Sequence, residues 1–158
     1  LDTPFGTVWS TNITPDRKTG IGAWSFDQFD RAMRKGVAAD GRQLYPAMPY
    51  PSYAKISDDD MKALWAYLKD GLAPAERANR PAEMRFPFNM RFGIALWNAV
   101  FLDTTPFVPD AAKDSVWNRG AYLVQGLGHC GAWCRRRWAT NWPGGSCPGT
   151  CATATPCG

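Results

Sequence analysis

Hydrophobic residues recur at helical spacing in the stretch that follows Ser25. Ser25 and Gln28, three positions apart, are typical of a capping box, in which each side chain bonds the backbone N–H of the other. Apolar residues then fall on one face, at Phe26, Phe29 and Met33. Gly36 follows as a residue that readily ends a helix. The pattern predicts an amphipathic helix from Phe26 to just before Gly36.

A second amphipathic helix is predicted after Ser57. Ser57 is a suitable N-cap, and the acidic run 58–60 occupies the first turn, where the helix dipole favours negative charge. Gly71 ends the pattern. The stripe that this helix is expected to bury consists of Met61, Leu64, Trp65 and Leu68.

Two further helices are predicted in the second half of the chain. Residues 89–102 (NMRFGIALWNAVFL) are apolar nearly all round, with a thin polar face of Arg91 and Asn98. This composition indicates a buried or interfacial helix, which either packs between domains or lies on a membrane surface with Trp97 and Phe101 as anchors. The last helix begins near Asp114 and runs toward Gly126 or Gly128.

The intervening segments are rich in proline, glycine and turn-forming residues. Residues 1–24 are expected to form loops and turns, and residues 37–56 no regular helix, because Pro46, Pro49 and Pro51 remove backbone donors. No apolar run of 18 or more residues is present, so the sequence predicts no membrane-spanning helix. The fold is therefore expected to be mainly α.

Charge and composition narrow the function classes. The 158 residues carry 18 basic and 14 acidic side chains, a net charge of +4, and 45% of the residues are hydrophobic, which argues against disorder of the body. Three of the basic residues are the run 135–137, so the rest of the chain is nearly neutral. This distribution argues against a nucleic-acid partner. A single histidine leaves no Ser-His-Asp or Cys-His set to assemble, and no glycine-rich phosphate loop is present.

Met48 is the first candidate for chemistry. It lies in the proline-rich segment 44–51 (LYPAMPYP), which is expected to be extended, and it belongs to no helical stripe. A thioether on a stiff loop is suited to a soft metal, and as an axial ligand it raises the reduction potential of a haem. The alternative is a loop methionine that covers the edge of the core.

The cysteines form the second candidate site, because all five lie from residue 130 onward: Cys130, Cys134, Cys147, Cys151 and Cys157. Covalent haem attachment requires C-x-x-C-H. Here Cys130 and Cys134 are separated by three residues and followed by Arg135, and the single histidine, His129, precedes them. The motif is therefore broken. Zinc binding, disulfides and free thiols remain as alternatives.

Four strings closely resemble the multihaem cytochrome c subunits of bacterial membrane-bound dehydrogenases, which are the partners of alcohol, gluconate, sorbitol or aldehyde dehydrogenases. They are TPFGTVWSTNITPD (3–16), TGIGAWS (19–25), LYPAMPY (44–50) and WNRGAYLV (117–124). The resemblance covers about residues 3–130. It implies that the chain is a fragment with an incomplete cytochrome c-like domain over 1–72, a linker with one apolar helix over 73–113 and the start of a second cytochrome c-like domain over 114–134.

The resemblance also implies roles for single residues. Met48 matches the axial ligand of the haem iron in the first domain, and Cys130, with Cys134 after it, matches the haem attachment site of the second. His129 matches the residue before that motif, which is not the iron ligand. Arg135 stands where the family has its proximal histidine. Residues 135–158 contain no acidic residue and no periodicity, and we interpret them as an irregular tail that arises from a shift of reading frame.

The function that the resemblance implies is electron transfer through haem c. Electrons would pass from the catalytic subunit of a membrane-bound dehydrogenase toward quinone or a terminal oxidase, at the periplasmic face of the cytoplasmic membrane, with membrane association through the parent protein. Substrate oxidation would belong to the partner. The alternative is a haem-free binding module with a cysteine-rich, zinc-binding tail.

Overall fold

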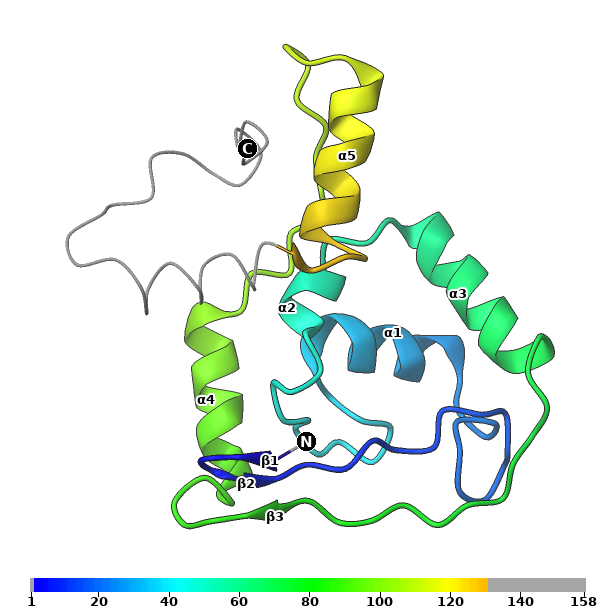
Figure 1. The fold of residues 1–158 in the computed structure, drawn as a ribbon, viewed down its shortest axis with the longest axis vertical. Helices are drawn as coiled ribbons and strands as arrows, with labels where there is room; N and C mark the ends of the chain where they lie inside the picture. Colours follow the sequence, from blue (N-terminus) through cyan, green and yellow to red (C-terminus); the bar gives the residue numbers. More distant parts are fainter. Residues whose placement is uncertain (1, 131–158) are drawn as a thin grey trace.

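The computed structural model describes residues 2–130, which form five helices and three two-residue strands (Figure 1). In chain order the elements are β1 (Asp2–Thr3), β2 (Gly6–Thr7), α1 (Phe26–Lys35), α2 (Tyr50–Tyr53), α3 (Asp58–Asp70), β3 (Glu83–Met84), α4 (Arg91–Phe101) and α5 (Ser115–Gln125). The prediction of a mainly α fold is confirmed.

The two amphipathic helices are confirmed together with their caps. Ser25 and Gln28 form the predicted capping box of α1, and Gly36 ends that helix in the left-handed conformation, with φ of 66°. Ser57 caps α3 through the backbone N–H of Asp60. The partners in each of these caps lie within a few residues of one another, which is why the local sequence suffices to predict where the helices begin and end.

The core lies where α1 and α3 meet. Phe29 of α1 stacks against Trp65 of α3 with ring centroids 5.0 Å apart. Part of the predicted α3 stripe is buried and part is partly buried at the rim of the core. The buried cluster consists of Ile21, Phe29, Ile56, Met61 and Leu68.

The expectation that residues 37–56 contain no regular helix is wrong over one turn. Residues 50–53 form α2, with Pro49 at its N-cap and Pro51 in its first turn. Proline is tolerated there because the first N–H groups of a helix have no partner within the helix. The prolines therefore position this turn of helix rather than exclude it.

A small sheet was missed by the sequence pattern. β2 pairs with β1 and with β3 in antiparallel fashion, and Gly6 lies opposite both Thr3 and Met84. A side chain at Gly6 would collide with the backbone of Glu83, and the φ of Gly6 is 134°. The sheet thus joins the start of the described chain to the segment before α4 (Figure 1).

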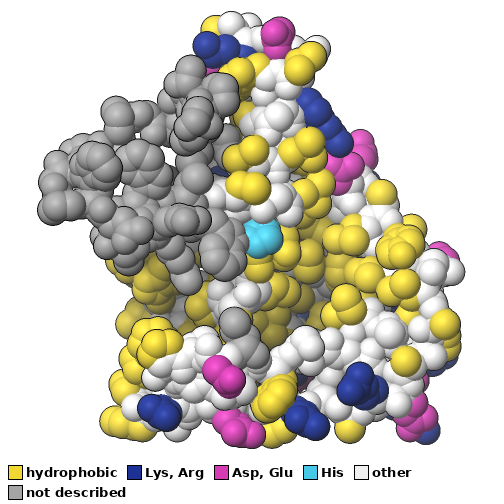
Figure 2. Space-filling model, viewed as in Figure 1, with side chains coloured by type: hydrophobic (Ala, Val, Ile, Leu, Met, Phe, Trp, Pro, Cys, Tyr) yellow, Lys and Arg dark blue, Asp and Glu magenta, His cyan; other side chains and the backbone are white. Residues whose placement is uncertain are grey.

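α4 is present as predicted; of the two expected alternatives, a buried or an interfacial helix, burial is not observed. None of its residues is buried. Its large apolar side chains point outward, and they are Phe92, Leu96, Trp97, Val100 and Phe101. The space-filling view likewise shows hydrophobic side chains spread over the molecular surface (Figure 2). Among the described residues, no helix combines the length and the hydropathy required to cross a bilayer.

Candidate functional site

Met48 lies in a turn directly before α2 and is partly buried. Its backbone N–H donates to the carbonyl of Tyr45 at 3.3 Å, and its carbonyl accepts from the N–H of Tyr50 at 2.8 Å. The expected extended conformation of this segment is therefore replaced by a hydrogen-bonded turn. The backbone that carries the thioether is thus hydrogen-bonded at both its N–H and its carbonyl.

Tyr50 anchors this turn to the end of α1. Its ring is fully buried, and it occupies the space that a side chain at Gly36 would take, because a Cβ there would lie 2.8 Å from the ring. Glycine is therefore required at residue 36 both for its positive φ and for this contact. The N–H of Leu44 also donates to the carbonyl of Gly36 at 2.7 Å.

The thin polar face of α4 holds the same turn from the other side. Asn98 accepts a hydrogen bond from the hydroxyl of Tyr50 at 2.9 Å and donates to the side chain of Gln43 at 3.2 Å. Arg91 donates to the carbonyl of Gln43 and lies 4.5 Å from the ring centroid of Tyr45. Burial raises the pKa of the Tyr50 hydroxyl, and the hydrogen bond with Asn98 opposes that rise. α4 thus contacts the Met48 turn through its polar residues and leaves its apolar face outside.

These supporting residues were not predicted as part of the site. Arg91 and Asn98 are seven residues apart, which places them on one face of a helix. That spacing was a usable signal. It could not show that the face points inward, because only the partners Gln43, Tyr45 and Tyr50 decide the direction.

A buried arginine fixes α2 relative to α1 and α3. The side chain of Arg34 is 10% exposed and forms ion pairs with Asp30 at 2.7 Å and Asp58 at 2.8 Å. Its guanidinium also donates to the backbone carbonyls of Ala54 and Ile56, at 3.1 and 2.8 Å. One side chain therefore satisfies the carbonyls that follow α2 and joins the two capped helices.

Cys130 lies exposed at the end of the described chain and forms no disulfide within residues 2–130. Its Sγ lies 3.4 Å from the carbonyl of Gly128. His129, the residue before it, has a φ of 40°, and its ring approaches Tyr53 edge-on with centroids 6.2 Å apart. The buried Nδ1 of His129 has no hydrogen-bond partner within the described residues. Cys134 and Arg135 lie outside the described residues.

α5 carries this cysteine end of the chain onto the start of α3. The hydroxyl of Tyr122 accepts from the N–H of Ser57 at 3.0 Å and donates to Asp60 at 2.5 Å. Gly126 packs near Ile56, so closely that a Cβ added at residue 126 would already contact it. The two predicted site regions therefore meet different ends of α2, with Met48 just before it and His129 against its last residue, Tyr53.

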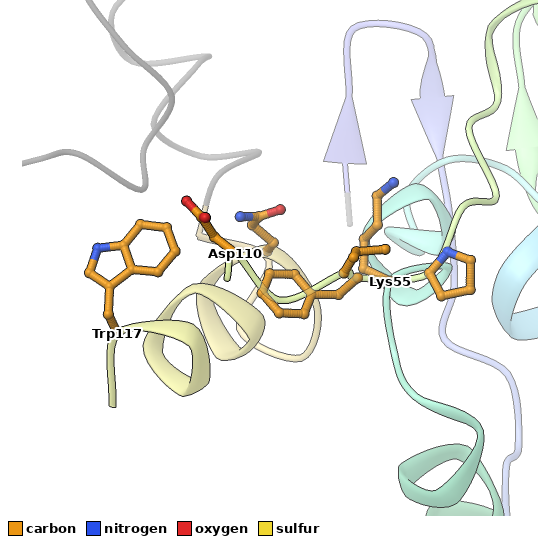
Figure 3. A pocket seen from close by; sticks show the side chains of 7 residues that line it. Lys55, Asp110 and Trp117 are labelled. Carbon is orange, nitrogen blue, oxygen red and sulfur yellow. The ribbon is translucent and has the colours of Figure 1, made fainter. Parts of the chain in front are cut away.

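An open hollow of about 350 Å³ lies between α5 and the segment that leads to it (Figure 3). Lys55, Asp110 and Trp117 line it together with Pro106, Phe107, Val108 and Gln125. Neither Met48 nor Cys130 contributes to its wall. The hollow therefore belongs to the junction between segments rather than to the candidate site.

Lys55 ties the segment after α4 to α2. Its ammonium donates to Asp103 at 2.6 Å and to the carbonyl of Thr105 at 2.9 Å. The hydrogen bond from Lys55, followed by those from Thr105, holds the pKa of the Asp103 carboxyl well below its ordinary value of 3.8. A lowered carboxyl pKa stabilises the fold above the ordinary pKa, and this contribution is lost as the pH falls through the lowered one.

We therefore expect Asp103→Asn to be less stable than the parent chain at pH 5–7 and this difference to shrink as the solution is acidified below about pH 4. Urea unfolding midpoints of both proteins, measured from pH 7 down to pH 2, test the expectation. Midpoints that stay parallel over the whole range would contradict it.

Metal binding other than to haem has no support in residues 2–130. No group of three or more His, Cys, Asp or Glu side chains comes together there. The zinc alternative depends on the cysteines from 134 onward, which lie outside the described residues.

No protein-family model matches the chain. Single proteins do. The chain is 56% identical over 133 residues to the gluconate 2-dehydrogenase cytochrome c subunit of Pantoea cypripedii, covering 84% of this chain and 30% of that protein. It is 43% identical over 132 residues to the cytochrome c subunit of a quinone-type alcohol dehydrogenase of Gluconobacter oxydans, covering 83% and 28%. A diheme cytochrome c-type protein of Cereibacter sphaeroides is 37% identical over 168 aligned positions, 99% of this chain and 55% of its own length. The chain thus spans between about three tenths and about half of the length of these relatives.

Proposed function

The chain is a homologue of the cytochrome c subunits of bacterial dehydrogenases, and from this premise we propose that it is a segment of a longer electron-transfer subunit that carries c-type haem. The observation that carries the proposal is this homology, combined with the hydrogen-bonded turn that holds Met48. In the proposal, residues 1–72 belong to one haem-binding domain, 73–113 to the linker, and 114–134 to the start of a second such domain.

The residues present fit part of what haem requires. Met48 offers a thioether on a turn held by backbone hydrogen bonds with Tyr45 and Tyr50, and Cys130 offers an exposed thiol. The single histidine and the five cysteines leave no C-x-x-C-H sequence among the 158 residues. The imidazole and the thiols for the first haem would therefore come from residues outside this chain.

Haem bound in this way supplies a one-electron couple between ferrous and ferric iron. The role of this chain is then to bind the haem and to set its reduction potential. Met48 would donate its sulfur to the iron and raise the reduction potential, because a thioether favours the reduced state. Arg34, Gly36 and Asn98 would fix the turn from which it does so.

Several relatives are named as subunits of gluconate, nicotinate, alcohol and fructose dehydrogenases. We extend this to a dehydrogenase catalytic subunit as the electron donor of this chain. We further propose quinone or a terminal oxidase as the acceptor and the periplasmic face of the cytoplasmic membrane as the location. Substrate oxidation would belong to the partner.

A pyridine haemochrome assay on the full-length subunit, expressed in the periplasm together with a cytochrome c maturation system, tests the proposal. Covalent haem that survives denaturing electrophoresis is expected. A subunit without haem, or with zinc in its place, would overturn it.

The broken motif permits a sharper experiment on the second site. Deleting Trp133 and replacing Arg135 with histidine converts the sequence that begins at Cys130 into C-G-A-C-H. This repaired chain is expected to attach haem, whereas the unchanged chain and the repaired chain carrying Cys130→Ala are not. Haem in the repaired chain that is undiminished by Cys130→Ala would show that Cys130 is not an attachment residue.

A further inference from the structure

α2 lies between the two regions that the proposed function assigns to haem. It is a helix of four residues, so it is only about 6 Å long. Met48 and Pro49 precede it directly, and its last residue, Tyr53, faces His129, the neighbour of Cys130. Residues that are 76 positions apart in sequence thus meet at one end of a single helical turn.

Tyr53 is held to the Met48 turn by backbone. Its N–H donates to the carbonyl of Pro49 at 3.1 Å, and its carbonyl accepts from the N–H of Ile56 at 3.1 Å. The position of the ring is therefore set by the same turn of chain that carries Met48.

The end of the chain that Tyr53 contacts is less firmly held than α5 itself. Tyr122 secures α5 through Ser57 and Asp60. Beyond Gly126, two local backbone hydrogen bonds remain, from Gly128 to Leu123 and from His129 to Gly126. The edge-on contact with Tyr53 is the ring contact that His129 makes within the described residues, and it draws the segment before Cys130 onto α2.

We propose that Tyr53 is a positioning residue whose ring holds His129, and through it Cys130, at a fixed place relative to the Met48 turn. The proposal rests on the proposed function in one respect, which is that Met48 serves a haem and that Cys130 lies at the start of the second cytochrome c-like domain. Tyr53 then sets the placement of the Cys130 end of the described chain relative to the Met48 turn, without contacting iron or substrate.

The single histidine of the chain makes this placement measurable without haem. The imidazole C–H signals of His129 are the only ones of their kind in the proton NMR spectrum, and the ring of Tyr53 displaces them from their positions in the urea-unfolded chain. In Tyr53→Ala these signals are expected to move toward the unfolded positions, and in Tyr53→Phe, which keeps the ring, they are expected to stay.

Amide hydrogen exchange gives a second measure of the same contact. Loss of an aromatic pair is expected to speed exchange at Gly128 and His129 by about two- to tenfold. Tyr53 also packs against the hydrophobic core, so Tyr53→Phe, which keeps the ring, is the matched control. Tyr67→Ala removes a tyrosine that is 59% exposed on α3 and is expected to leave exchange unchanged. Should Tyr53→Ala fail to fold by circular dichroism, Tyr53→Leu, which retains apolar volume, replaces it. Unchanged His129 signals and unchanged exchange in a folded variant that lacks the ring would overturn the proposal.

A third measurement separates this inference from the proposed function. In the haem-loaded full-length subunit, Tyr53→Ala is expected to shift the reduction potential or the electron paramagnetic spectrum of one haem while the absorption due to the sulfur–iron bond of Met48 persists. A subunit without haem would refute the proposed function and leave the two measurements above to decide the role of Tyr53. A haem-bearing subunit whose potentials and spectra do not change would refute the positioning role alone.

Discussion

Replacing Met48 by alanine or leucine in the full-length, haem-bearing subunit is expected to lower the reduction potential of one haem by on the order of 0.1 V, within the roughly 0.8 V range that axial ligands span. The reason is the loss of the thioether, which favours ferrous iron. Spectroelectrochemical titration measures the potential, and the visible absorption due to the sulfur–iron bond reports the ligand directly.

The two substitutions separate ligation from packing. Leucine nearly conserves the volume of methionine and removes only the sulfur, so a packing role predicts a normal potential in Met48→Leu and an altered one in Met48→Ala. A ligand role predicts the same loss in both. Met90→Leu is the matched control, because Met90 is a partly exposed methionine outside the helical stripes, 37% exposed, at the N-cap of α4. Potentials that remain normal in both Met48 variants would remove this residue from the site.

Arg34→Ala is expected to destabilise the chain by about 2–4 kcal/mol, which corresponds to an unfolding midpoint roughly 10 °C lower. The substitution leaves the buried carbonyls of Ala54 and Ile56 without their donor, at about 1–3 kcal/mol for each. The effect falls short of that for a fully buried ion pair because Asp58 is 82% exposed and returns to water at little cost. Thermal and urea unfolding followed by circular dichroism measure the loss.

Two further variants test whether the geometry of the guanidinium matters. Arg31→Ala removes an arginine from the same helix on its exposed side and is expected to cost less than about 0.5 kcal/mol. Arg34→Lys keeps the charge but cannot donate to two carbonyls and two carboxylates at once, so it is expected to recover only part of the stability. Full recovery with lysine would show that charge alone holds α2 in place.

Local signals predicted the helices well. Ser25 with Gln28, Ser57 with the acidic run 58–60, and Asp114 each mark a helix start through hydrogen bonds that reach no more than three residues along the chain. The same is true of Gly36, which ends α1. Such signals work because both partners lie within one turn and need no distant residue.

Two of the errors concern contacts between distant segments, and a third, over α2, is local. The β2–β3 pairing joins residues about 80 positions apart, and no periodicity can be read from strands of two residues. The apolar face of α4 predicted burial, yet the hydrogen bonds of Arg91 and Asn98 turn the polar face inward. α2 was missed because three prolines outweighed the first-turn exception that admits them.

The residues of the candidate site also differ in whether a local sequence signal marks them. Met48 was selected from the sequence because it lies between prolines and outside any helical stripe, and Cys130 because all cysteines cluster at one end; both stay predictions. Tyr50, Arg34 and Tyr53 carried no local signal, since their roles depend on Gly36, on the carbonyls after α2 and on His129.

Residue patterns alone were enough to establish the mainly α character and the positions of the capped helices, and they singled out the two residues whose haem roles remain a proposal. These properties follow from hydrogen bonds and side-chain spacing within a few residues. The folded chain was needed to place Met48 before α2 and His129 beside its end, and to turn the polar side of α4 toward the site. Burial and direction are set by the partners a residue meets, and here those partners lie some 50 to 80 residues away along the chain.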